Sequence, residues 1–293
     1  MQATEGDHGL STLHSLVLGL VEGLTEFLPV SSTGHLIVAN AFFGTSDPAF
    51  EVAIQAGAIT AILVLYWRPL LRSLAALWQK RAAADAAGSG GTNLLVAIFI
   101  AAVPAAGIGL CLDDLIESYL FDPLVVAATL ILGGLGFFWV EAWSDRRTNA
   151  GHTPTTMADL TPRQALVIGF WQTLALIPGT SRSGATIVGG LVTGLSRAAA
   201  AEFSFLVGLP ILYGACVLKL ASDFERFTGP MLPSVLVASA ASFVTALLIV
   251  GPFVRFLQRH TFRPFAWYRI AAGVAIVALW GAGIIRVDAP AAG

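Results

Sequence analysis

Two carboxylates, Glu22 and Glu26, lie four residues apart in the first apolar stretch of the chain. Residues four apart share one face of a helix, so these side chains are expected to point the same way. Acidic residues inside an apolar segment are costly to bury and are functional by default. The pair could hold a divalent cation through oxygen ligands, or one member could act as a general base. The structural alternative is an interfacial pair, or a pair neutralised by Arg182.

A hydroxyl-rich turn follows the two acids and contains Ser31, Ser32, Thr33 and His35. A hydroxyl near an imidazole and a carboxylate provides a nucleophile, a proton acceptor and an orienting group. The alternative is structural, because a lone histidine is often merely hydrogen-bonded and Ser/Thr clusters commonly cap helices. The short spacing between Glu26 and His35 favours the catalytic interpretation.

A second turn, residues 178–186 (PGTSRSGAT), combines one arginine with glycines and hydroxyls at membrane depth. Arg182 is expected to open a new helix. Free N–H groups at a helix start, a guanidinium and flanking hydroxyls together make a phosphate cradle. Gly179 and Gly184 let the backbone approach an anionic headgroup closely. The alternative is that Arg182 forms a buried ion pair with one of the two acids, and an empty phosphate site could rest in that paired state.

The elements that must position these turns are predicted to be membrane-spanning helices. Hydrophobic residues make up 56% of the 293 residues and charged residues 12%, against about 25% charged in soluble domains. Such a chain needs the bilayer as its solvent. The net charge of −2 argues against a nucleic-acid partner. Six apolar stretches are long enough to cross a membrane, namely 49–67, 93–112, 123–143, 198–218, 232–254 and 266–285.

Two further apolar regions, 10–43 and 164–195, are each interrupted near the middle by one of the two turns. The pieces on either side are too short to cross a bilayer alone. Each region is therefore predicted to be a re-entrant hairpin of two half-helices. The regions also resemble each other, because Pro29 matches Pro178 and Gly57 matches Gly208 at a nearly constant offset.

The resemblance between the two regions predicts an inverted repeat within one polytopic membrane domain, 1–293. Its first half, 10–143, and its second half, 164–285, would each hold one hairpin and three spans. Three is an odd number, so the second half must be inserted upside down relative to the first. The predicted fold is an all-α membrane protein with six transmembrane helices and two hairpins whose turns meet near the midplane.

The charge of the connecting loops predicts the orientation of the chain. Basic residues follow the first, third and fifth spans, whereas the stretch 113–122 holds acids and no base. Positive loops stay inside, so those three loops are expected to be cytoplasmic and the acidic hairpin to open to the periplasmic side. Residues 1–9 lack the basic region of a signal peptide, and 82–93 is predicted to be a flexible linker.

Two signatures make the chain resemble a known family. Residues 19–36 (GLVEGLTEFLPVSSTGHL) resemble the first signature of the undecaprenyl-diphosphate phosphatase family, which is linked to bacitracin resistance. Residues 175–186 (ALIPGTSRSGAT) resemble its second signature, and the stretches 50–55 and 203–206 also fit. The resemblance extends over essentially the whole chain in length and segment order.

The resemblance implies a multi-pass enzyme of the bacterial inner membrane, which would hydrolyse undecaprenyl diphosphate to the monophosphate and recycle the lipid carrier of cell-wall synthesis. It also implies a divalent cation, Mg²⁺ or Ca²⁺, at the acidic pair Glu22 and Glu26. Ser32 matches the proposed nucleophile, His35 its catalytic partner and Arg182 the phosphate-binding arginine. The candidate phosphate-binding residues of the two turns are Ser31, Thr33, Gly179, Thr180, Ser181, Arg182, Ser183, Gly184 and Thr186.

Two competing functions are compatible with the same residues. A secondary transporter or flippase of a lipid phosphate would use the same midplane site, since inverted repeats with broken helices are typical of transporters. A non-catalytic lipid-binding membrane protein is the third class. The sequence leaves the attacking group open between Ser32, His35 and water. It is compatible with a homodimer, and its expected partners are the lipid substrate and the surrounding membrane lipids.

Overall fold

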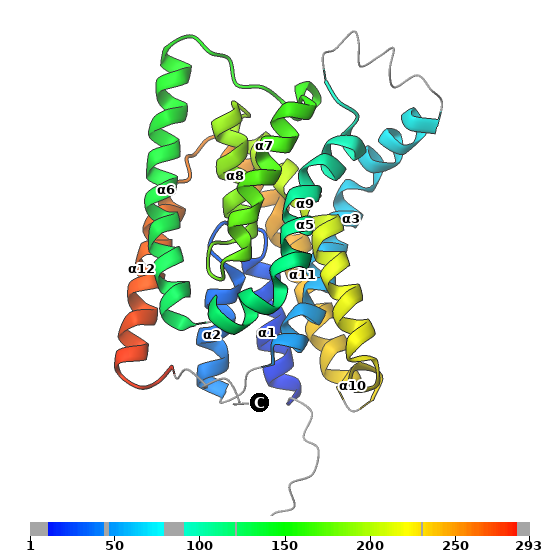
Figure 1. Cartoon of the computed structure of the whole chain (residues 1–293), viewed down its shortest axis with the longest axis vertical. Helices are drawn as coiled ribbons and strands as arrows, with labels where there is room; N and C mark the ends of the chain where they lie inside the picture. The colour runs from blue at the N-terminus through cyan, green and yellow to red at the C-terminus, as the bar shows by residue number, and fades with distance from the viewer. Residues whose placement is uncertain (1–10, 44–46, 79–90, 121, 230, 286–293) are drawn as a thin grey trace, which may run out of the picture.

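The computed structural model describes residues 11–43, 47–78, 91–120, 122–229 and 231–285, and within these ranges it contains helices and no strand (Figure 1). This agrees with the predicted all-α fold. The helices are α1 Thr12–Thr25, α2 Ser32–Phe43, α3 Pro48–Trp78, α5 Leu94–Leu120, α6 Pro123–Asn149, α7 Pro162–Gln172, α8 Arg182–Thr193, α9 Arg197–Ser222, α10 Phe224–Thr228, α11 Leu232–Leu257 and α12 Arg263–Gly281, with two 3-10 turns, η1 Met157–Asp159 and η2 Thr173–Leu176.

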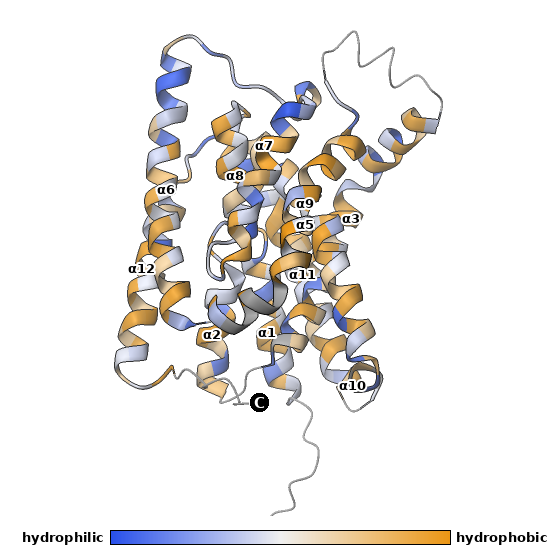
Figure 2. Cartoon of the chain, in the orientation of Figure 1, coloured by the Kyte–Doolittle hydropathy of each residue, from blue (hydrophilic) through white to orange (hydrophobic). Residues whose placement is uncertain are grey.

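Six of these helices are long and apolar enough to cross a membrane, so the chain is a multi-pass membrane protein. Their apolar sections are Ala49–Trp78, Leu94–Leu112, Pro123–Asn149, Arg197–Ser222, Leu232–Leu257 and Arg263–Gly281. Each contains, or largely overlaps, one of the six predicted spans. Figure 2 shows apolar residues along most of the helix length and hydrophilic residues gathered at the upper ends of α6 and α7.

Several helix ends differ from the sequence prediction. α3 continues to Trp78 with Pro69 inside it, and α5 continues to Leu120 through most of the acidic stretch that was predicted to be a loop. α12 ends at Gly281, four residues earlier than predicted. Hydropathy marks the section of a helix that fits in lipid, whereas backbone hydrogen bonding can carry the helix on into the aqueous phase. The N-terminal stretch 1–9 and most of the predicted linker lie outside the described residues.

Both interrupted regions form two short helices joined by a tight turn. α1 and α2 flank the first turn, and α7, with η2, and α8 flank the second. Ser31 and Ser181 are the non-glycine residues with positive φ in the described parts of the chain, and both have a φ of 71°. Each serine Oγ also accepts the N–H of the glycine three residues later, Gly34 or Gly184. The two turns therefore share one backbone geometry, in which the serine caps the second helix.

The short helices pack against long helices from the other half of the chain. α1 packs on α11, and α7 packs on α5. Both contacts are close, because a Cβ at Gly23 would overlap the backbone of Ser242, and a Cβ at Gly169 would overlap the backbone of Ala101. Small residues of this kind let membrane helices approach at backbone distance. In Figure 1, α1 and α2 occupy the lower half of the bundle and α7 and α8 the upper half.

One end of the bundle is tied together by an ionic cluster. The fully buried Glu141 of α6 accepts the backbone N–H of Phe262 at 2.7 Å and pairs with Arg197 at the start of α9. Asp145 pairs with the same arginine at 3.0 Å and with Arg263 at 3.2 Å. The loops after the third and fifth spans therefore lie at the same end of the molecule, as their shared basic character predicted.

Candidate active site

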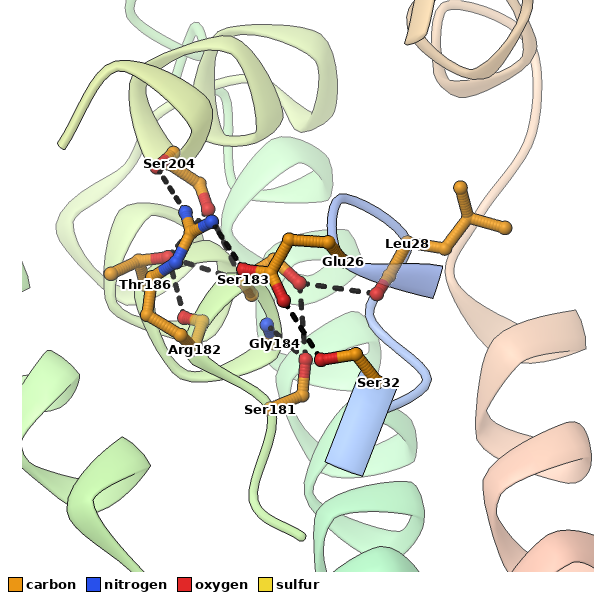
Figure 3. A network of polar contacts seen from close by, with 9 residues as sticks. All are labelled: Glu26, Leu28, Ser32, Ser181, Arg182, Ser183, Gly184, Thr186 and Ser204. Carbon is orange, nitrogen blue, oxygen red and sulfur yellow. Dashed lines mark hydrogen bonds and ion pairs between the residues drawn. The ribbon is translucent and has the colours of Figure 1, made fainter. Parts of the chain in front are cut away.

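The two turns meet at the carboxylate of Glu26, which is buried with 6% of its side chain exposed (Figure 3). Ser32, the first residue of α2, donates its Oγ–H to Glu26 Oε2 at 2.8 Å. Arg182, the first residue of α8, donates from Nη2 to Glu26 Oε1 at 2.8 Å. One carboxylate thus holds a hydroxyl from the first turn and a guanidinium from the second. These three predicted site residues come together.

An ion pair and a hydrogen bond to a backbone carbonyl hold the Arg182 side chain in place. Besides the ion pair with Glu26, its Nη1 donates to the carbonyl of Ser204 in α9 at 2.7 Å. A Cβ at Gly208 would overlap the guanidinium, so this glycine makes room for it. Arg182 Nε is buried and has no hydrogen-bond partner among the described residues. The predicted alternative, a buried ion pair, is therefore the state seen here, and the Nε–H is still available for a phosphate oxygen.

Hydroxyls of the second turn form a dense network beside Arg182 (Figure 3). Ser183 Oγ donates to the carbonyl of Leu28 at 3.1 Å, which is a direct bond between the two turns, and lies 3.0 Å from Ser181 Oγ. The buried Thr186 hydroxyl lies 2.6 Å from Ser204 Oγ. These three predicted phosphate-binding hydroxyls therefore belong to the hydrogen-bonded network beside Arg182.

Glu22 lies one helical turn before Glu26 and is fully buried, yet neither of its carboxylate oxygens has a hydrogen-bond partner in the described part of the chain. A buried ionised carboxylate without a partner costs several kcal/mol, roughly the penalty of removing any single ion from water. Glu22 therefore needs either a proton or a bound cation. Its charged neighbours are Glu26 and Glu51, which favour either a proton or a cation at Glu22, and Arg182, which opposes both.

These residues fit a divalent cation only as partial ligands. Among the described residues, no group of three or more His, Cys, Asp or Glu side chains is arranged to hold a metal. Mg²⁺ is commonly held by one or two carboxylates together with substrate phosphates and water. The unpartnered oxygens of Glu22 fit such a role. Both oxygens of Glu26 are already hydrogen-bonded.

His35 lies in the first turn of α2, and neither of its ring nitrogens is hydrogen-bonded to Ser32. Its Nδ1 is 2.7 Å from the carbonyl of Ser31, and its Nε2 is 2.6 Å from the hydroxyl of Tyr268 in α12. The His35 and Tyr268 rings are stacked with centroids 5.6 Å apart. The arrangement predicted from sequence, in which His35 is the proton acceptor next to Ser32, is not the one present here. Glu26 occupies that position instead.

Arg269 is a central residue that the sequence prediction missed. It is fully buried in α12 and donates to carbonyls of both turns: Pro29 at 3.2 Å, Gly179 at 3.3 Å and Thr180 at 3.0 Å. Further donations go to the carbonyls of Thr129 and Leu130 in α6. Arg269 has no carboxylate partner among the described residues. Its charge therefore adds to the positive potential at the turns.

The remaining predicted residues of the turns act through the backbone in this structure. The carbonyls of Gly179 and Thr180 accept from Arg269. Gly179 has a φ of +84°, and a Cβ there would overlap Thr129, so glycine is required at this turn. Thr33 is half-buried at the start of α2. Gly179 and Thr180 thus shape the second turn, whereas Ser32, Arg182 and the hydroxyls beside Arg182 carry the polar side-chain groups.

Comparison with known proteins identifies the family to which the chain belongs. A family model described as "Bacitracin resistance protein BacA" matches residues 15–275, a range that contains both turns. The chain belongs to this family. Members similar to it include proteins named undecaprenyl-diphosphatase from Acidovorax ebreus, 42% identical over 94% of this chain and 97% of the relative, and Verminephrobacter eiseniae, 44% identical over 89% and 92%. A third, named undecaprenyl-diphosphatase 3, from Acinetobacter baylyi is 41% identical over 92% and 97%. The predicted resemblance is confirmed, and the family relationship covers nearly the whole chain.

Proposed function

We propose that this BacA family member hydrolyses undecaprenyl diphosphate to undecaprenyl phosphate and free phosphate, and so recycles the lipid carrier of cell-wall synthesis. The observation that carries the proposal is the single carboxylate of Glu26, which links the Ser32 hydroxyl to the Arg182 guanidinium. The names of the full-length relatives support the same reaction. They lend no support to the transporter alternative.

In the proposed mechanism, Ser32 Oγ attacks the terminal phosphorus while Glu26 Oε2 takes the hydroxyl proton. The bond between the terminal phosphorus and the bridging oxygen breaks, and its electron pair leaves with the lipid monophosphate. Water then attacks the phosphoserine and becomes part of the free phosphate, while Ser32 leaves and recovers the proton from Glu26. The 2.8 Å contact between Ser32 Oγ and Glu26 Oε2 suits this proton transfer.

The second turn would stabilise the charge of the transferred phosphoryl group. When the diphosphate enters, Arg182 is expected to exchange part of its contact with Glu26 for phosphate oxygens. This frees Glu26 to act as a base. Ser181, Ser183 and Thr186 would supply further donors, and Arg269 would hold both turns in register. Positioning and charge stabilisation of this kind dominate phosphoryl transfer.

Glu22 is the residue that we expect to hold a divalent cation, Mg²⁺ or Ca²⁺, with Glu26 as the second carboxylate. Such an ion would neutralise the charge on the diphosphate oxygens. The support is the burial of Glu22 together with its two unpartnered oxygens.

We further propose that the two broken regions are re-entrant hairpins related by an inverted repeat, in a bacterial inner membrane. The matched geometry of Ser31 and Ser181 supports the repeat, and so does the packing of α1 on α11 and of α7 on α5. The site would open to the periplasmic side, because the basic loops lie at the opposite end of the bundle from α1 and α2.

The decisive experiment is phosphate release from undecaprenyl diphosphate by the purified protein in detergent, with and without EDTA. We expect release that EDTA abolishes and that Mg²⁺ or Ca²⁺ restores. Detergent removes the second compartment, so release there would exclude a function limited to transport. Folded, lipid-bound protein that releases no phosphate with any cation would contradict the proposal.

A further inference from the structure

The hydrogen bonds of His35 determine which of its ring nitrogens carries the proton. A carbonyl oxygen only accepts, so Nδ1, at 2.7 Å from the Ser31 carbonyl, must carry a hydrogen. In the neutral ring, Nε2 is then the acceptor, and the Tyr268 hydroxyl donates to it at 2.6 Å. The result is a directional chain from Tyr268 O–H to Nε2, and from Nδ1–H to the Ser31 carbonyl.

These hydrogen bonds end at the peptide group that joins Ser31 to Ser32, the predicted nucleophile. Ser31 has a φ of 71°, which residues other than glycine rarely adopt. Ser32 is the next residue. A strained residue of this kind persists only where its surroundings hold it in place. His35 supplies one of those restraints from the side chain, and Tyr268 fixes His35 from a different helix.

The second turn has no such chain, although its backbone is the same. The residue that matches His35 is Ala185, which has no polar side chain. The carbonyl of Ser181, which matches that of Ser31, accepts the backbone N–H of Ala185. Arg269 donates to carbonyls of both turns and so does not distinguish them. The Tyr268–His35 contact is therefore specific to the turn that carries the nucleophile.

We propose that Tyr268 is a positioning residue that acts through His35 to hold the Ser31 peptide and so aims Ser32 at Glu26. The inference rests on the proposed function and deepens it, because it gives His35 a role other than accepting the proton of Ser32. Tyr268 is about half exposed, at 48%. Its ring would be retained on loss of the hydroxyl, so the hydroxyl can be tested separately from packing.

Kinetics of Tyr268→Phe test the role in the reaction. We expect kcat to fall by about tenfold to a hundredfold, the scale of a small misplacement of a reacting group, with KM within twofold of the wild-type value. Tyr213→Phe is the matched control. It removes another tyrosine hydroxyl with a hydrogen bond, 2.8 Å from Thr60, and should keep kcat within twofold.

The effects of substitutions at His35 and Tyr268 on kcat should also be coupled. In a His35→Gln background, Tyr268→Phe should lower kcat by no more than a further twofold, since the connection to Ser31 is already lost. An equal loss in both backgrounds would overturn the proposal, as would a Tyr268→Phe variant that is folded and fully active.

A spectroscopic measurement tests the hydrogen bonds from Tyr268 through His35 to Ser31 without relying on turnover. Nitrogen-15 NMR of histidine-labelled protein, with His35 assigned by the His35→Gln difference, should show a protonated Nδ1 and an unprotonated Nε2 at neutral pH. Tyr268→Phe should shift the Nε2 resonance, and Tyr213→Phe should not. A protonated Nε2 in the neutral ring would overturn the chain itself. An absence of phosphate release by the wild-type protein would instead overturn the proposed function and leave this result standing.

Discussion

The two turns at the centre of the bundle have matching backbones and opposite chemistry. Ser31 and Ser181 adopt the same φ and cap the following helix in the same way. The first turn is flanked by Glu26 and followed by Ser32, whereas the helix after the second turn begins with Arg182 at the position that matches Ser32. One scaffold thus presents a carboxylate with a nucleophile, and the other presents a cation with hydroxyl donors.

The difference shows how a repeated structure can form an asymmetric site. Neither turn balances its charge alone, because the carboxylate of Glu26 and the guanidinium of Arg182 lie largely out of solvent and each is the ion-pair partner of the other. An anionic substrate can enter such a pair by replacing one partner. The backbone geometry is shared, so the division of labour between the turns comes from a few side chains.

The largest expected effect comes from removing the carboxylate that joins the turns. Glu26→Gln should lower kcat for phosphate release by about 10³-fold, within the range of about 10²–10⁴ for lost general-base catalysis. Asp145→Asn is the control, since this acid also pairs with an arginine but lies at the end of the bundle. Steady-state phosphate release measures both. Similar turnover in Glu26→Gln and wild type would mean that the first turn does not take part in the reaction.

The next effect tests the geometry of the second turn. Arg182→Lys keeps the charge but cannot reach Glu26 and the Ser204 carbonyl with two separate nitrogens. We expect kcat/KM to fall about 100-fold, as for the loss of one preorganised donor. Arg263→Lys, at an exposed ion pair, should change kcat/KM by less than twofold. If both lysine variants behave alike, the turn requires only a positive charge.

The Mg²⁺ concentration needed for activity should depend on Glu22 more than on other acidic residues. Glu22→Gln should raise the Mg²⁺ concentration for half-maximal activity by about tenfold or more, because a carboxylate ligand is lost. Asp145→Asn is the control: this acid pairs with Arg197 and Arg263 at the end of the bundle, so the Mg²⁺ requirement should stay within threefold. A Mg²⁺ titration of phosphate release distinguishes them. An unchanged titration for Glu22→Gln would leave that residue as a neutral structural acid.

The smallest effect concerns the shared backbone. Glycine at Ser31 or Ser181 should change the free energy of unfolding by no more than about 1 kcal/mol, since relief of the positive φ offsets the lost cap. Valine at either position should lower the unfolding temperature in detergent clearly. The two positions should respond alike, because they share the φ and the serine cap. A large difference between them would mean that the φ and the cap are not what determines the response.

The sequence was sufficient for the six spans, the two breaks and the residues at their turns. Apolar runs with interruptions give the spans and the breaks, and charges at membrane depth are rare enough to mark a site. The same rule would have singled out Arg269, which lies in the apolar stretch 266–285. It was overlooked because no motif surrounds it.

Other features required three-dimensional contacts. The choice of Glu26 over His35 as the partner of Ser32 depends on side-chain directions, which spacing alone does not fix. The contact between His35 and Tyr268 joins residues at opposite ends of the chain. The continuation of α5 to Leu120 depends on where backbone hydrogen bonding stops, and hydropathy does not report this.

A double-mutant cycle across the two turns tests most directly whether they form one active site. Phosphate release is measured for Ser32→Ala, Arg182→Ala and the combined variant, each checked for folding by size exclusion. If the turns form one active site, the combined variant should be about as slow as the slower single variant, because residues that act as a unit are not additive. Losses that multiply, or a single variant with wild-type turnover, would contradict the claim that both turns serve one reaction.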